Sequence, residues 1–117
     1  MDEQIELTML FDFYGELLTK KQQEYFRLHR MEDLSLSEIA ESESISRQGV
    51  WDNIRRAEET LRRSEEKFGL LGRYLRQQAA AEALERDTQE LLTLTTGRAR
   101  ELAENIRRRV QELQHGI

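Results

Sequence analysis

The stretch from Leu34 to Leu61, LSLSEIAESESISRQGVWDNIRRAEETL, limits the fold more than any other part of the chain. Ser35 and Glu38 have the spacing of a capping box at the start of a helix, and Ser46 is a typical cap for a second helix. Apolar residues then recur at helical spacing, at Val50, Ile54, Ala57 and Leu61. Two helix starts so close together predict a helix-turn-helix unit over about residues 35–62.

Several residues inside this unit suit that geometry. Ala40 is small enough to let the two helices approach closely, and Ile45 is expected to fill the space under the turn. Ser44 stands where such turns often have a glycine with a left-handed backbone. The apolar stripe is expected to continue to Phe68, and Gly69 and Gly72 to end a helix of about 22 residues.

Composition restricts both the fold class and the compartment. The 117 residues contain no cysteine and no proline and are rich in Glu, Arg, Leu, Gln and Ala, so the chain is expected to be all-α and to form no disulfide. No apolar run is long enough for a transmembrane helix, and the acidic N-terminus lacks the features of a signal peptide. We therefore expect no membrane insertion and a cytoplasmic location.

The residues before the central unit are expected to support it. Residues 2–16 form a helix that is apolar on several sides, so it serves either as a core strut or as a contact with a partner subunit. Thr19 and Gln22 form another capping box. The apolar face of that second helix is expected to contain Tyr25, Phe26, Leu28 and Met31. Residues 1–69 are thus predicted to form a four-helix domain.

Residues 70–117 are predicted to form an antiparallel helical hairpin with a polar loop over residues 93–97. Its apolar positions are Tyr74, Ala81, Leu84 and Leu91, with Leu75 and Leu92 beside them, and then Leu102, Ile106, Val110 and Leu113. These are too few for a stable isolated hairpin, so it should pack on the first domain or on a partner subunit. A homodimer is the expected assembly. The basic cluster Arg107–Arg109 is either a solvated helix end or a phosphate contact.

The exposed side of the second helix of the central unit holds the candidate binding residues. In a helix-turn-helix this helix enters the major groove and presents its first turns to the bases. The predicted nucleic-acid-binding residues are Ser46, Arg47, Gln48, Trp51, Arg55 and Arg56. Asp52 and Glu59 lie among them and oppose DNA, as does the net charge of −5. Trp51 could cover the core, stack on a base or anchor a protein.

The sequence gives no indication of catalysis. It has no phosphate-binding glycine loop, no cysteine nucleophile and no cluster of metal ligands. His29 and His115 have no neighbouring carboxylate at a spacing that would orient them. We therefore expect a protein that is not an enzyme and that uses no metal and no cofactor.

Two family resemblances rest on these residues. The segment from Leu18 to Val50, with its capped helix, acidic turn, L-S-x-x-E-I-A and I-S-x-x-x-V, resembles region four of sigma factors. The segments at residues 10–26, 34–41 and 46–58 more closely resemble the YlxM-like family of bacterial helix-turn-helix proteins. That resemblance implies a DNA-binding regulator linked to the signal recognition particle and its receptor. The fold it implies is a sigma region 4-like bundle.

The sequence supports three functional hypotheses. The first is a helix-turn-helix regulator that binds DNA. The second is an accessory protein that binds the RNA or the GTPase of the signal recognition particle. The third is a helical interaction module that forms a homodimer.

Overall fold

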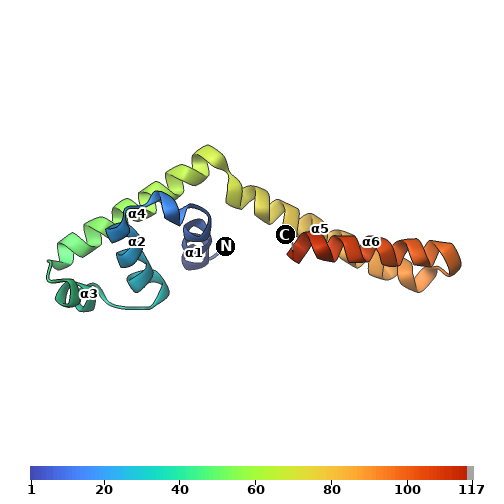
Figure 1. Cartoon of the computed structure of the whole chain (residues 1–117), viewed down its shortest axis with the longest axis horizontal. Helices are drawn as coiled ribbons and strands as arrows, with labels where there is room; N and C mark the ends of the chain where they lie inside the picture. The colour runs from blue at the N-terminus through green and yellow to red at the C-terminus, as the bar shows by residue number, and fades with distance from the viewer. Residues whose placement is uncertain (116–117) are drawn as a thin grey trace. The chain divides into compact units, whose positions relative to one another are not determined.

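The computed structural model describes residues 1–115, and the last two residues of the predicted hairpin lie outside it. The described chain is all-α and contains no strand (Figure 1). Its six α-helices are α1 (Glu3–Tyr14), α2 (Lys20–Phe26), α3 (Leu36–Glu43), α4 (Arg47–Phe68), α5 (Leu70–Leu94) and α6 (Gly97–His115). The chain divides into two compact units, residues 1–71 and residues 72–117, whereas the sequence placed the division after residue 69.

Side-chain caps fix the starts of the helices in the first unit. Thr19 accepts a hydrogen bond from the Gln22 amide at 3.1 Å, and the Gln22 side chain accepts one from the Thr19 amide at 3.1 Å. Ser35 and Glu38 form the same reciprocal pair, with both distances at 3.0 Å. Ser46 caps the start of α4 as predicted, because its side chain accepts a hydrogen bond from the Gly49 amide. These three predictions are confirmed because a cap depends only on residues three apart.

Helix α4 is the central element of the first unit, since α1, α2 and α3 all pack against it. Its predicted stripe is completely buried, at Val50, Ile54, Ala57 and Leu61. Tyr25, Ile39 and Ala40 pack with the first part of this stripe. The rings of Phe11 and Phe26 stack with their centroids 4.9 Å apart, which joins α1 to α2. Helix α4 also has the predicted length of 22 residues.

Helix α1 buries only one of its apolar sides in this chain. Leu7, Leu10 and Tyr14 are buried, whereas Ile5 and Phe13 are exposed. The helix ends in a 3-10 turn at Gly15–Leu17. Its role as a core strut is therefore visible in the burial of Leu7, Leu10 and Tyr14.

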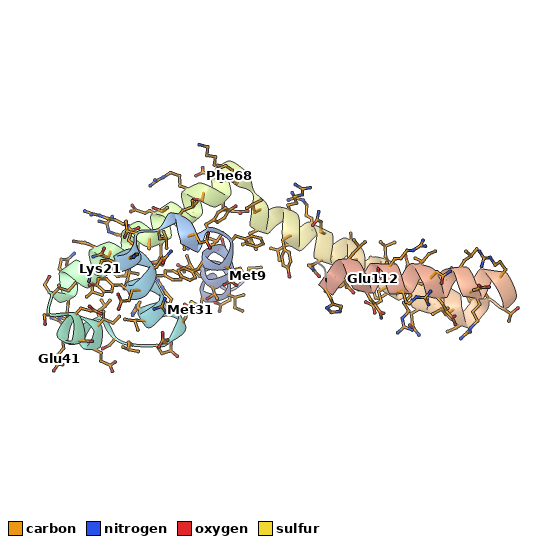
Figure 2. All side chains as sticks on the ribbon, viewed as in Figure 1. Met9, Lys21, Met31, Glu41, Phe68 and Glu112 are labelled. Carbon is orange, nitrogen blue, oxygen red and sulfur yellow. The ribbon has the colours of Figure 1, made fainter. Side chains whose placement is uncertain are left out.

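Three predicted core residues are exposed, which corrects the interpretation of the sequence. Met31 is 43% exposed at the end of the π-helical turn Arg27–Met31, which follows α2 (Figure 2). Phe68 is 57% exposed, since it ends α4 beyond the core and Ser64 takes the buried position before it. Ile45, which was expected to fill the space under the turn, is 39% exposed. Leu28 is half-buried, as a boundary residue of the predicted face.

A hydrogen-bonded junction links the end of α4 to the start of α5. Gly69, with φ of +64°, ends α4, whereas Gly72 lies inside α5 rather than at a helix end. The buried Tyr14 hydroxyl donates to Glu65 Oε1 at 2.8 Å and accepts from the Leu70 amide at 3.0 Å. Glu65 Oε1 also accepts from the Leu71 amide at 3.0 Å. Burial, and then the bond to Glu65, raise the pKa of Tyr14 above its ordinary value of 10.0.

In the second unit, α5 and α6 lie side by side and run antiparallel (Figure 1). Arg100 donates to the Leu92 carbonyl at 2.7 Å, and the Gln111 amide donates to Glu85 Oε1 at 3.5 Å. The connection is shorter than expected, because α5 continues to Leu94 and α6 begins at Gly97, whose φ is +63°.

The predicted apolar seam of the hairpin is confirmed at Leu92 and Val110, which are buried, and is wrong at most of its other large residues. The buried residues between α5 and α6 are Thr88, Leu92, Ala103 and Val110. Most of the large apolar side chains assigned to the seam are exposed instead, namely Tyr74, Leu84, Leu91, Leu102, Ile106 and Leu113. Small residues let two helices approach closely, so the contact forms along the smaller side chains and leaves the larger ones on one exposed side of the hairpin.

Candidate nucleic-acid interface

A three-residue connection joins α3 to α4 and sets their geometry. Ser44 ends α3 in the left-handed region, with φ of +56° and ψ of +42°. The Ile45 amide then donates to the Ala40 carbonyl at 3.1 Å. Ser46 caps α4 through a hydrogen bond from the Gly49 amide to its hydroxyl at 3.0 Å. A serine thus takes the left-handed position at which glycine is common.

The N-terminal ends of α3 and α4 border a surface groove of about 820 Å³. Four of the six predicted binding residues line it: Ser46, Arg47, Gln48 and Trp51. Ser35, Leu36 and Ser37 complete the lining from α3. Sequence reasoning missed these three residues, although the capping box at Ser35 already marked the start of the helix that carries them.

Trp51 is partly exposed in this groove, with 37% of its surface accessible. It is excluded from the fully buried core that Val50 and Ile54 form on the same helix. A tryptophan placed in this way offers an apolar surface and an N–H donor to a ligand in the groove.

Gln48 and Arg55 make intrahelical contacts on the exposed side of α4. The Gln48 amide donates to Asp52 Oδ1 at 3.0 Å. Arg55 lies 2.9 Å from Glu59 Oε1 and 3.9 Å from Asp52 Oδ1. These contacts partly neutralise the positive charge of Arg55 and hold the side chains of Gln48 and Arg55 along the helix. Each exposed ion pair stabilises the helix by only about 0.3–0.5 kcal/mol.

Arg47 and Arg56 are exposed and form no ion pair with any residue from 1 to 115. Other arginines of this unit bind across helices: Arg30 contacts Glu58 at 2.7 Å, and Arg62 contacts Glu3 at 3.3 Å. Both pairs join α4 to earlier parts of the chain. The arginines of α4 that are available to a ligand therefore include Arg47 in the groove and Arg56, which lies two and a half turns further along the helix.

The remaining candidate features have local roles. His29 Nδ1 lies 2.8 Å from the Leu34 carbonyl, next to the start of α3. In the basic cluster of α6, Arg108 donates to Asn105, and Arg107 lies beside α5 in the second unit. Within residues 1–115, no three potential ligands of the His, Cys, Asp or Glu type are placed to hold a metal ion. No described helix has the length and hydropathy needed to cross a membrane.

Two capped helices, a short left-handed connection and a buried stripe on the second helix together define the class of helix-turn-helix proteins. Residues 1–110 match the model of a family described as "UPF0122: Putative helix-turn-helix protein, YlxM / p13 like", and the chain belongs to this family.

The relatives extend this match across several bacteria. A UPF0122 protein of Acetivibrio thermocellus is 47% identical over 91 residues, which cover 78% of each chain. One of Geobacillus kaustophilus is 46% identical over 84 residues, or 72% of this chain and 76% of the relative. One of Listeria innocua is 47% identical over 79 residues, or 68% of this chain and 72% of the relative. The YlxM-like resemblance found in the sequence is thus confirmed.

Proposed function

We propose that this protein is a regulator that binds duplex DNA through the first turns of α4. The observation that carries the proposal is the groove at the N-terminal ends of α3 and α4, in which Ser46, Arg47, Gln48 and Trp51 gather. Backbone amides at a helix N-terminus favour a phosphate group. Arginine can bind phosphate or guanine, and glutamine can bind adenine in the major groove.

Within the helix-turn-helix class, we propose the arrangement of sigma factor region four. Its supporting features are a capped helix α2 before α3 and a long α4 that packs against α1, α2 and α3. In this arrangement Arg47 contacts the DNA backbone or a guanine at the entry of α4, and Arg55 and Arg56 contact phosphates further along. The intrahelical pairs of Arg55 must open for this contact.

Fluorescence anisotropy with labelled genomic DNA fragments at low salt tests the proposal. Arg47→Ala should weaken binding about tenfold and reduce the salt dependence by about one counterion. Arg63→Ala is the matched control, because it removes the same charge from an exposed position on the second half of α4 and should change binding less than about twofold. Absence of binding at low salt, or equal effects of both variants, would contradict DNA binding through this groove.

A second candidate function is supported by the acidic neighbours of Arg55. Asp52 and Glu59 hold its guanidinium and place negative charge on the side of α4 that would face a nucleic acid, which suits a basic protein surface better than a phosphate backbone. An accessory role, with binding to the RNA or the GTPase of the signal recognition particle, is the corresponding proposal. Co-purification from cells, followed by anisotropy with that RNA and pull-down with that GTPase, distinguishes the two functions. Binding to neither component while DNA binding persists would exclude the accessory role.

A further inference from the structure

The hairpin of α5 and α6 leaves one apolar side exposed. The large side chains on this side are Tyr74, Leu84, Leu91, Leu102, Ile106 and Leu113. Leu84 is 50% exposed and Leu113 is 77% exposed, and both line a groove of about 590 Å³ between the helices. At roughly 150–200 Å² for a fully exposed side chain of this size, the six expose about 500 Å², which is near the upper limit for a monomer.

The contact between α5 and α6 is too poor in apolar residues to stabilise the hairpin. Thr88, Leu92, Ala103 and Val110 are its buried members. Arg107 and Gln111 lie beside them, and the Nε atom of Arg107 is buried without a hydrogen-bond partner among the described residues. Two helices with so small a core need further burial, which a four-helix bundle provides.

The exposed side of α5 carries four apolar residues at coiled-coil spacing. Ala80, Leu84, Leu91 and Leu94 follow one another at steps of four, seven and three residues. Such spacing keeps these side chains on one side of the helix, where they can contact a second helix. Ala80 is small and leaves space for a leucine from the opposite helix.

The charges along α5 select an antiparallel copy of the same helix. Arg73 and Arg76 stand in its first turns, and Asp87 and Glu90 stand in its later turns. All four are exposed, and none forms an ion pair within the part of the chain that the structure describes. A parallel copy would place like charges together, whereas an antiparallel copy places each basic end against an acidic end.

We propose that a second copy of this chain binds the exposed side of the hairpin, with the two α5 helices antiparallel about a two-fold axis near residues 82–83. In this register Leu84 packs on Ala80 of the second copy, and Arg76 lies opposite Glu90 of the second copy. Because the interface is two-fold symmetric, every contact occurs twice. Two patches of this size bury about 1,000 Å² before the flanking charges are added, which approaches the range of specific interfaces.

Sedimentation equilibrium of the full chain between about 1 and 100 μM tests the assembly. The wild-type protein should have twice the 13.9 kDa mass of one chain. Leu84→Glu should raise the dissociation constant more than about 100-fold, because it buries two unpaired carboxylates at the interface. Ala79→Glu is the matched control: it adds the same charge at an exposed position of α5 outside the seam and should leave the mass unchanged.

Charge reversal tests the antiparallel register. Arg76→Glu and Glu90→Arg should each raise the dissociation constant about tenfold, and the double variant should restore the wild-type value, because the pair is rebuilt with its signs exchanged. Far-UV circular dichroism should show wild-type helicity in Ala79→Glu and in the double reversal. Leu84→Glu and the single reversals should lose helicity as they dissociate, because the isolated hairpin has too small a core. A monomeric wild-type protein at 100 μM, or a dimer unaffected by Leu84→Glu, would overturn the proposal. Single reversals without effect would overturn the register.

Discussion

Replacing Tyr14 with phenylalanine should weaken the first unit at the junction between α4 and α5. The change removes the hydroxyl that donates to Glu65 Oε1 at 2.8 Å and accepts from the Leu70 amide at 3.0 Å. A hydrogen bond to a charged group contributes about 1.5–3 kcal/mol, and a buried amide left unpaired costs a similar amount. Because the junction is only partly buried, we expect a loss of about 1.5–2 kcal/mol in the free energy of unfolding.

Thermal unfolding and hydrogen exchange measure this loss. For a unit of this size, it corresponds to a decrease of about 6–16 °C in Tm. The Leu70 amide should also exchange faster with solvent than in the wild-type protein, because its acceptor is gone. Tyr25→Phe is the control: Tyr25 is buried too, but its hydroxyl forms no hydrogen bond with the described residues, so its removal should cost less than about 0.5 kcal/mol.

The pH dependence of the same variant tests the electrostatic part of the argument. The folded state raises the pKa of Tyr14 above 10.0, so its contribution to stability is complete below pH 10.0 and is lost as the pH rises through the folded-state pKa. The difference in stability between wild type and Tyr14→Phe should therefore shrink above pH 10.0. Equal stabilities of Tyr14→Phe and Tyr25→Phe at neutral pH would refute the reasoning, as would a difference that grows in alkali.

Three further predictions concern the helix-turn-helix unit. The hydrogen bonds from the Ser35 amide and hydroxyl lower the pKa of Glu38. The contribution of Glu38 to stability is therefore present above pH 4.5 and is lost as the pH falls through its folded-state pKa. Glu38→Gln should remove this acid dependence in urea unfolding curves. Ser44→Gly should raise the stability to urea by about 0.5–1 kcal/mol, because it relieves a left-handed serine. Glu59→Gln should release Arg55 and tighten DNA binding about threefold in the anisotropy assay, and weaker binding would contradict DNA contact by Arg55.

The two units differ in how far the sequence predicted them. In the first unit, α4 buries one stripe against three other helices, so the spacing of its apolar residues correctly identified the core at Val50, Ile54, Ala57 and Leu61. In the hairpin, each helix has two candidate seams, one with small residues and one with large residues. The periodicity of one helix is the same for both, so it could not decide which seam would face the other helix.

Local interactions explain what the sequence determined by itself. The caps at Thr19, Ser35 and Ser46, the spacing of the apolar residues of α4 and the left-handed position at Ser44 all depend on residues a few positions apart. Only the tertiary structure decided which residues line the groove beside Arg47, because Ser35–Ser37 reach it through the packing of α3 on α4. It also decided the exposure of Phe68, Met31 and the large residues of the hairpin. Burial depends on what lies opposite a side chain, and that partner is distant in the sequence.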